Sequence, residues 1–303
     1  MSIKVKNITK LYGAQKALDG VSFEINAGEV VGLVGPNGAG KSTIMKILTC
    51  FIPPSSGDAS VCGFDVLEQS MDVRKLVGYL PENNPLYLDM YVKEYLEFVA
   101  GIHKLGNQTK KRIVEMIDIT GLQLEQKKKI GALSKGYRQR VGLAQVLIHD
   151  PKVLILDEPT SGLDPNQLAE IRQLIIKIGK EKTVMLSTHI MQEVEAVCSK
   201  TIIINKGVIV ADKTTAELHQ GNSNKTVILV EFNSKVEKKL LLSISGVEDA
   251  LNTKANMWEI ITGSVKDIRS EIFDFAVKHQ LQVISMQKEE KTLEEVFHQL
   301  TKN

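Results

Sequence analysis

A glycine-rich segment early in the chain has the residue types and spacing of a phosphate-binding loop. The segment GPNGAGKST follows the apolar run VVGLV and precedes a stretch with helical periodicity, the setting that such a loop requires. Its glycines let successive backbone N–H groups point at phosphate oxygens, while Lys41 can reach the terminal phosphates and the Ser42 hydroxyl can bind Mg²⁺. A glycine-rich turn with a chance lysine would need neither flanking element. We therefore expect nucleotide contacts from Gly35, Pro36, Asn37, Gly38, Ala39, Gly40, Lys41, Ser42 and Thr43.

Two adjacent acidic residues end an apolar run farther along the chain. In VLILDEPTSGLDPN, Asp157 and Glu158 come at the end of an expected strand. Side chains alternate along a strand, so the two carboxylates must have different roles. Beside a phosphate-binding loop, Asp157 can hold Mg²⁺ while Glu158 faces the terminal phosphate and polarises the attacking water. The alternative is an acidic strand end that contacts solvent. Asp164 and Pro165 also form a favourable N-cap and N1 pair for the next helix.

A histidine ends a third apolar run. His189 directly follows TVMLST, and an isolated histidine in such a position is more often structural than catalytic. The carboxyl ends of parallel strands lie at one edge of a sheet, which places His189 near Gly35 and Asp157. This shared edge favours a role in phosphate chemistry.

Three cations surround the start of a predicted helix. In LSKGYRQR, Lys135 precedes the expected first turn, and Arg138 and Arg140 lie within it. A helix N-terminus carries partial positive charge and free N–H groups, so cations there are unfavourable. An anion supplied from outside the chain would compensate them. The alternative is an ordinary surface helix capped by Ser134.

The elements that must position these residues alternate between strands and helices. Short apolar runs, several of them apolar on both faces, predict buried strands at VSFEI, VVGLVG, VLILD, TVMLS and TIIIN. Amphipathic helices are expected at Ser42–Cys50, Val92–His103, Lys110–Thr120, Tyr137–His149 and Pro165–Gly179. This alternation predicts an α/β fold with a mainly parallel sheet, whose ligands bind at the carboxyl ends of the strands.

The pattern changes near Leu218. The polar stretch HQGNSNK, residues 219–225, is typical of a linker, and strand-like and helix-like segments alternate in a different order after it. We predict a first domain at residues 1–220, which contains a helical subdomain at about residues 83–150. A C-terminal α+β accessory domain of ferredoxin-like type is expected at residues 224–303.

Composition narrows the class of protein. The 303 residues suffice for one large domain and a smaller one, and the net charge of +2 provides no basic field for nucleic acid. Three cysteines without C-x-x-C spacing favour a reducing compartment over disulfides or a metal site. No apolar run approaches the ~20 residues of a membrane-spanning helix, and no signal segment is visible. We therefore expect a soluble chain that can still dock on a membrane protein.

The joint order of these motifs resembles the ATP-binding subunits of ABC transporters. The phosphate-binding loop, LSKGYRQR, LDEPTSGLD and THIMQEVE carry the resemblance, which covers roughly Ser2–His219. The whole chain resembles exporter ATPases with a small C-terminal domain. Within these, GYLPENNPLYLDMYVKEYL and KKIGALSKGYRQRVGLAQVLIH resemble the gliding-motility transporter of Bacteroidetes most. The resemblance implies that two subunits enclose two ATP molecules head to tail.

The resemblance also assigns roles to single residues. The signature residues Ser134, Lys135 and Gly136 would meet the ATP held by the other subunit, which supplies the missing anion. Lys135 could add charge directly, whereas Arg138 and Arg140 are expected to pair with acids or to face the partner subunit. His189 would sense the γ-phosphate. The family more often has glycine at position 135 and glutamine at position 137, so Lys135 and Tyr137 depart from its pattern.

Three further positions take roles from the family. Tyr12, in KLYG, would stack on adenine; otherwise it is a half-buried turn tyrosine. Glu82 stands where the family usually has a glutamine that contacts Mg²⁺ and water, and exporter relatives often carry glutamate there. Asp164 would belong to the loop that contacts the opposite subunit.

These observations together predict an ATPase with ATP and Mg²⁺ as cofactors. We expect it at the cytoplasmic face of the cell membrane, as a peripheral homodimer or beside a paired ATPase subunit. It would drive an exporter through separate integral membrane permease subunits, with no nucleic-acid partner. The apolar stretch ENNPLYLDMYVKEYLEF, residues 82–98, is expected to receive a helix from a permease subunit unless its residues fold inward.

Two other functions remain open from the sequence alone. One is a soluble ABC ATPase that acts on ribosomes or DNA; such relatives typically carry two cassettes in one chain, whereas this chain has one. The other is an ATP-gated binding module without catalysis, which the Asp157–Glu158 pair and His189 disfavour.

Overall fold

The computed structural model describes residues 1–220, 226–263, 267–289 and 293–301, and its contacts form two compact units. The first contains Met1–Thr215 and Phe297–Asn303, and the second contains Ala216–Val296. This division differs from the expected domains in two respects. The boundary lies at Thr215 and Ala216 and not at residues 220–224, and the end of the C-terminal helix groups with the first unit. Residues 221–225 of the predicted linker lie outside the described residues.

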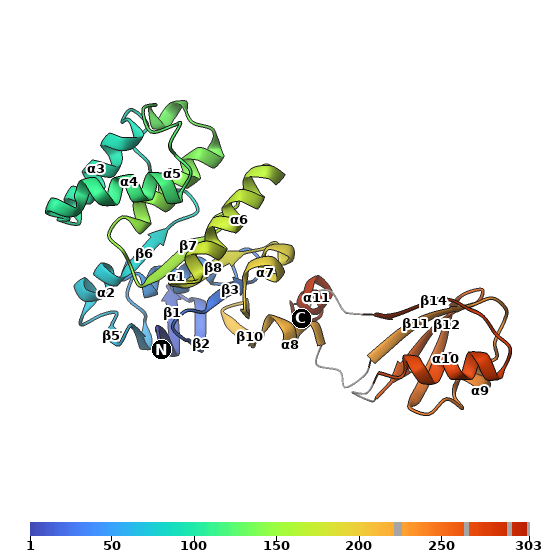
Figure 1. The fold of residues 1–303 in the computed structure, drawn as a ribbon. Coiled ribbons are helices and arrows are strands. Elements are labelled where there is room, and N and C mark those ends of the chain that lie inside the picture. The colour runs from blue at the N-terminus through green and yellow to red at the C-terminus, as the bar shows by residue number, and fades with distance from the viewer. Residues whose placement is uncertain (221–225, 264–266, 290–292, 302–303) are drawn as a thin grey trace. The chain divides into compact units, whose positions relative to one another are not determined.

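A six-stranded sheet forms the centre of the first unit (Figure 1). Its order is β10-β9-β3-β8-β7-β6, and every neighbouring pair is parallel except β9 with β10. The strands are β3 (Val30–Val34), β6 (Val77–Leu80), β7 (Val153–Asp157), β8 (Thr183–Thr188), β9 (Lys200–Asn205) and β10 (Val208–Thr214). The predicted mainly parallel α/β sheet is confirmed, and β7 and β8 are buried along their whole length, as their continuous apolar runs indicate.

A second, antiparallel sheet was not predicted. Its order is β2-β1-β4-β5, formed by β1 (Ile3–Tyr12), β2 (Gln15–Ile25), β4 (Ser56–Val61) and β5 (Phe64–Asp65). Helix α1 (Lys41–Leu48) contacts β2 and β4 of this sheet and β7 of the parallel sheet. The apolar side chains of α1, among them Ile44 and Met45, are fully buried in the core shared by the two sheets. Helix α1, which must carry the phosphate-binding loop, is therefore held by both sheets.

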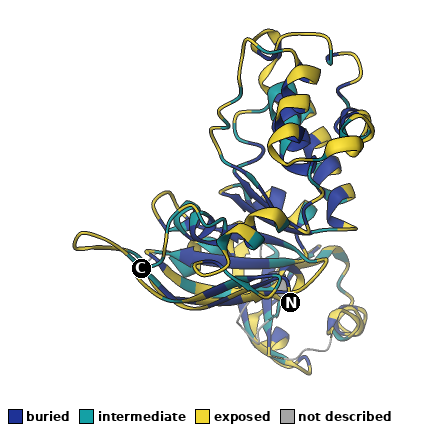
Figure 2. Ribbon diagram, turned by 90° about the vertical axis from the view of Figure 1, so that its left-hand side faces the viewer, coloured by how far each residue is buried: buried dark blue, intermediate teal, exposed yellow. Residues whose placement is uncertain are grey.

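The segment between β6 and β7 forms a helical region. It contains α3 (Val92–Ile102), η1 (Gly106–Gln108), α4 (Thr109–Ile119), η2 (Ile130–Ala132) and α5 (Lys135–Leu147). The three α-helices contact one another, and Figure 2 shows that their buried residues lie on the inner faces. The other helices of this unit are α2 (Ser70–Leu76), α6 (Pro165–Gly179) and α7 (Met191–Val197). Helix α8 (Thr215–Gln220) begins where the two units meet in sequence.

The second unit has the element order of a ferredoxin-like domain. Its antiparallel sheet has the order β12-β13-β11-β14, with β11 (Thr226–Phe232), β12 (Val247–Lys254), β13 (Met257–Thr262) and β14 (Val283–Glu289). Helix α9 (Lys238–Leu241) and helix α10 (Arg269–Lys278) complete it, and α11 (Leu293–Thr301) follows. Phe232, Ile260 and Trp258 belong to the core of this unit.

Candidate ATP-binding and hydrolysis site

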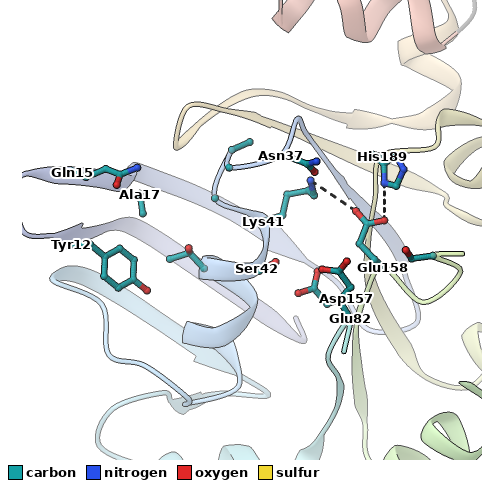
Figure 3. Close-up of a pocket in the computed structure, with 15 residues that line it drawn as sticks. Tyr12, Gln15, Ala17, Asn37, Lys41, Ser42, Glu82, Asp157, Glu158 and His189 are labelled. Carbon is teal, nitrogen blue, oxygen red and sulfur yellow. Dashed lines mark hydrogen bonds and ion pairs between the residues drawn. The ribbon is translucent and has the colours of Figure 1, made fainter. Parts of the chain in front are cut away.

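The carboxyl ends of β3, β7 and β8 adjoin a cavity of about 480 Å³, a volume typical of small-molecule sites (Figure 3). The predicted residues that line it are Tyr12, Asn37, Gly38, Ala39, Gly40, Lys41, Ser42, Thr43, Glu82, Asp157, Glu158 and His189. Gln15, Ala17 and Ser161 also line the cavity and were not predicted. Gln15 and Ala17 belong to the antiparallel sheet, whose position beside the loop has no local signal in the sequence. Gly35, Pro36, Asp164 and the signature residues lie outside the lining.

Two glycines of the loop are required by close backbone packing. A Cβ atom on Gly35 would lie 2.3 Å from the Ile204 carbonyl oxygen. A Cβ atom on Gly40 would lie 2.7 Å from the Ala17 carbonyl oxygen, and Gly40 has a φ of +110°. Helix α1 then begins at Lys41 without a side-chain cap or an acidic residue in its first turn. Its N-terminal N–H groups are therefore available to an anion.

Lys41 points back into this loop. Its Nζ donates hydrogen bonds to the carbonyl oxygens of Gly35, at 2.7 Å, and Pro36, at 3.3 Å. Burial lowers the pKa of the Lys41 ammonium, while the carboxylates across the cavity, Glu158 foremost, act in the opposite direction. The Lys41 Nζ lies 4.0 Å from the nearer oxygen of Glu158, so the cavity holds a cation and an anion on opposite sides.

A buried serine separates the orientations of the two adjacent acids. The Ser187 hydroxyl donates to Asp157 Oδ1 at 2.6 Å and accepts from the Glu158 backbone N–H at 2.9 Å. Asp157 is thereby fixed within the sheet, while Glu158 extends into the cavity and accepts a hydrogen bond from His189 Nδ1 at 2.9 Å. Ser187 is fully buried and was not predicted as a site residue. The contact depends on the register between β7 and β8, which pairs Asp157 with Ser187.

Glu158 has an unusual backbone conformation. Its φ is +49°, a left-handed value that non-glycine residues rarely adopt. The Ser187 hydroxyl bond and a bond from the Ser161 N–H to the Glu158 carbonyl, at 3.1 Å, hold this conformation. Such conformations cluster at functional sites, where the surrounding structure maintains them. Here it directs the Glu158 side chain between Lys41 and His189 (Figure 3).

Comparison of this chain with known proteins identifies the family to which it belongs. A family model described as ABC transporter matches residues 18–161. An uncharacterised ABC transporter ATP-binding protein of Bacillus subtilis, YhcH, is 32% identical over 99% of this chain and 95% of its own length. The chain belongs to the family of ABC transporter ATP-binding proteins. It is therefore an ATP-hydrolysing subunit. Members of this family work together with membrane permease subunits.

Several relatives and solved structures support this placement. The bacitracin transport ATP-binding protein of Bacillus licheniformis is 35% identical over 76% of this chain and 78% of its own length. The linearmycin resistance ATP-binding protein of Bacillus subtilis is 30% identical over 99% of this chain and 98% of its own length. CbiO1 of Clostridium perfringens has a TM-score of 0.67 and 31% identity, covering 72% of this chain and 90% of that chain.

A dimeric cassette bound to ADP and phosphate, MJ0796, has a TM-score of 0.64 and 26% identity. The match covers 70% of this chain and 98% of that chain. ABC cassettes therefore bind adenine nucleotide and form dimers on this fold. In the part of this chain that the structure describes, no helix is both long and apolar enough to cross a membrane.

The structure places the three cations of the LSKGYRQR segment individually. Ser134 caps α5, and its hydroxyl accepts from the Tyr137 N–H at 3.4 Å. Arg138 turns back to the carbonyl oxygens of Leu133 and Gly131, at 3.0 and 3.1 Å, instead of pairing with an acid as expected. Two of the three cations thus leave the helix N-terminus, because Arg140 likewise bonds elsewhere.

Arg140 donates to the Thr120 carbonyl oxygen at 2.7 Å and pairs with Glu170 of α6, as the expectation of an acidic partner requires. Asp164 caps α6 by accepting N–H groups of Asn166 and Gln167 at 3.1 and 3.0 Å. This capping role was predicted and leaves one carboxylate oxygen of Asp164 outside the cap.

Tyr12 and Glu82 lie on opposite sides of the cavity (Figure 3). Tyr12 is 50% exposed, and Lys10 Nζ lies over its ring, 5.4 Å from the centroid. Glu82 is exposed beside Asp157, close enough to contribute to the field at Lys41.

Proposed function

We propose that this ABC cassette forms a head-to-tail dimer when it binds ATP and hydrolyses ATP with Glu158 as general base to drive export. The Glu158 carboxylate supports this proposal most directly, because it lies in the cavity between Lys41 and His189. The LSKGYRQR residues do not line the cavity of their own chain, so the ATP contact proposed for them would be made with ATP held by a second subunit.

The side chains divide the hydrolytic step among them. The loop N–H groups and Lys41 bind the phosphates and stabilise the charge that develops on the departing β-phosphate. Glu158 accepts the proton of the water that attacks the γ-phosphorus in line, and the bond from that phosphorus to the bridging oxygen breaks. His189 orients the Glu158 carboxylate through the 2.9 Å hydrogen bond. It also lines the cavity, and we propose that it contacts the γ-phosphate there.

The donor set in the cavity suits Mg²⁺. Ser42, Asp157 and Glu82 provide a hydroxyl and two carboxylates, and all three line the same cavity. Mg²⁺ prefers such oxygen ligands and is usually held by one or two carboxylates together with substrate phosphates. Among the described residues no cluster of three or more His, Cys, Asp or Glu side chains could hold a metal ion. The phosphates of ATP would therefore have to complete the ligand set around Ser42, Asp157 and Glu82. When bound, Mg²⁺ would neutralise phosphate charge.

A substitution at Glu158 tests this proposal. Glu158→Gln preserves the shape of the side chain but removes the base, so ATP should bind while its hydrolysis falls by about 10²-fold or more. The variant should accumulate as a dimer with ATP, measured by size-exclusion chromatography, because hydrolysis no longer separates the subunits. Glu181→Gln, at an exposed position, is the matched control. Turnover of Glu158→Gln within threefold of the unmodified chain would refute the assignment.

We also propose that a permease subunit binds the surface formed by Tyr87, Leu88, Tyr91, Phe98 and Ile102, called the docking surface. These side chains are 44–61% exposed, so the alternative in which they fold inward does not apply to them. Tyr87 packs edge-on against Phe98, with ring centroids 5.6 Å apart, which gives the patch a defined shape. Exposed apolar patches of this kind favour helix docking.

Two hydrogen bonds connect the loop that carries the docking surface to η2, which directly precedes LSKGYRQR. The Gly131 N–H donates to the Leu88 carbonyl oxygen at 2.8 Å, and the Ile130 N–H donates to the Met90 carbonyl oxygen at 2.9 Å. The same loop begins at Glu82 in the cavity. Movement of a docked helix would therefore reach both the ATP site and LSKGYRQR.

Export is proposed because relatives named for bacitracin transport and for linearmycin resistance match this chain. The match to the linearmycin resistance protein covers 99% of this chain. The narrower hypothesis of gliding motility depends on the two stretches that carry that resemblance. Deletion of the gene in its source organism tests the gliding-motility hypothesis. Loss of surface gliding would support it, and intact gliding would refute it.

A further inference from the structure

Lys135 differs from Arg138 and Arg140 in the part of the chain that its side chain contacts. Arg138 and Arg140 are engaged by carbonyl oxygens and by Glu170. Lys135 instead lies over Gly162, in the turn between β7 and α6. A Cβ atom on Gly162 would be 2.2 Å from Lys135 Nζ and 3.4 Å from its Cε. In this position the Lys135 ammonium occupies the space that a side chain at residue 162 would take.

A second contact lies directly beside the first. A Cβ atom on Gly136 would be 2.6 Å from both Cδ and Oε1 of Gln167, in the first turn of α6. Two consecutive residues at the start of α5 thus pack against the segment that leads from β7 into α6. The start of α5 and this segment form a single packed contact within one subunit.

The Gly162 turn is continuous with the catalytic carboxylate. The Ser161 N–H bonds to the Glu158 carbonyl oxygen at 3.1 Å, and the Leu163 N–H bonds to the Thr160 carbonyl oxygen at 3.2 Å. Ser161 also lines the cavity. A displacement of Gly162 is therefore transmitted to Glu158, whose left-handed φ of +49° depends on the same turn.

We propose that Lys135 is a positioning residue that couples the two ATP sites of the dimer. This inference rests on the proposed head-to-tail dimer, in which LSKGYRQR contacts the partner's ATP while Glu158 serves its own. Binding of the partner's γ-phosphate shifts the start of α5, and Lys135 transfers that shift to Gly162 and so to Glu158. Such coupling requires a structural element whose conformational equilibrium is shifted by ligand binding at either site.

The test is the cooperativity of ATP hydrolysis by the full-length chain. Lys135→Gly should lower the Hill coefficient toward 1, which corresponds to loss of a coupling factor of about fivefold or more. Lys110→Gly provides the matched control, because Lys110 is also an exposed lysine in the first turn of a helix in the same region. Its Hill coefficient should equal that of the unmodified chain.

A double-mutant cycle with Gly162→Ala isolates the contact. The new methyl group would displace Lys135, so this variant should also reduce cooperativity, and the effect should be absent when Lys135 is already glycine. The strain of alanine at φ +67° is present in both backgrounds and cancels.

The dimer is measured separately in a Glu158→Gln background. If ATP produces no dimer in that background, the proposed function fails and this inference fails with it. If the dimer forms and Lys135→Gly retains full cooperativity, or if the cycle is additive, only the coupling role of Lys135 is refuted.

Discussion

Ser187 holds two neighbouring carboxylates in different orientations. Its hydroxyl bonds to Asp157 Oδ1 and to the Glu158 N–H, and it is fully buried. Ser187→Ala would leave both partners without this bond in a buried site, which typically costs about 1–3 kcal/mol of folding stability. Because the Glu158 conformation depends on the same hydroxyl, we expect ATP turnover to fall at least about tenfold. Steady-state phosphate release and urea unfolding measure the two effects.

The control for this prediction removes a buried hydroxyl elsewhere. Thr201, on β9, is buried and bonds to Thr215 at 3.1 Å, away from the cavity lining. Thr201→Ala should reduce the free energy of unfolding by a similar amount while turnover of the folded protein is retained. Equal turnover in the two variants would contradict the role of Ser187 in positioning the carboxylates.

The sequence identifies most of the residues that line the cavity, because the loop and the strand-end acids have local patterns. Ser187 was missed for a physical reason. Its importance depends on the register that pairs Asp157 with Ser187 between β7 and β8, and register between segments so distant in sequence has no local signal. Arg138 was assigned an acidic partner for the same reason, since its carbonyl partners depend on the path of the preceding loop.

At the level of elements, the loop between β6 and α3 carries the prediction about the permease. Leu88 is 49% exposed and its carbonyl oxygen is bonded to Gly131. Leu88→Glu would place a charge in an apolar interface, so co-purification with the permease should be lost while ATP hydrolysis by the isolated subunit persists. Leu124→Glu, at an 88% exposed position of the helical region outside the docking surface, is the control. Co-purification of Leu88→Glu at the unmodified yield would place the docking site elsewhere.

The junction between α5 and β6 predicts a dependence of stability on pH. The His149 ring stacks on His103, with centroids 4.0 Å apart, and its Nε2 lies 3.2 Å from the Val77 carbonyl oxygen. Burial, with a smaller contribution from His103, lowers the pKa of His149 to about 4. The unfolded chain binds this proton near pH 6.5, so stability is full above that pH and is lost as pH falls toward 4.

Urea unfolding between pH 7 and pH 4 measures this effect. His149→Gln removes the titrating group, so the unfolding midpoint of that variant should vary less over this interval than the midpoint of the unmodified chain. His103, whose pKa burial also lowers, remains in the variant, so the pH dependence should be reduced and not abolished. An identical pH profile in the two proteins would contradict the prediction.

The elements with strong periodicity were predicted closely, whereas those fixed by tertiary pairing were not. The predicted helix at Pro165–Gly179 has the observed bounds of α6, where Asp164 and Pro165 give a local start signal. Strands β1 and β4 pair with each other across a long separation, and the polar composition of β4 gives no strand pattern. Their stability comes from pairing and from the shared core beneath them.

For the whole molecule, the grouping of the last helical turn with the ATP-binding unit leads to a prediction about truncation. Every residue that lines the cavity lies within Met1–Thr215. A chain that ends at residue 220 should therefore bind ATP with an affinity within about twofold of the full chain, measured by titration calorimetry. Loss of ATP binding in a truncated chain that remains folded by circular dichroism would place essential nucleotide contacts in the C-terminal region.

The same truncated chain should nevertheless melt at a lower temperature. Phe297 and Leu300 are half-buried, and Asn205 Nδ2, at the end of β9, donates to the Thr301 carbonyl oxygen at 3.4 Å. Gly207, two residues after Asn205, donates its N–H to the Ala39 carbonyl oxygen in the phosphate-binding loop at 3.0 Å. The end of α11 therefore contacts the turn between β9 and β10, and that turn contacts the loop. Loss of about 1 kcal/mol here corresponds to a fall in Tm of about 2–4 °C. Deletion of residues 297–303 alone should reproduce this fall in the ATP-sensitive transition, and an unchanged Tm would show that the contact does not stabilise the ATP-binding unit.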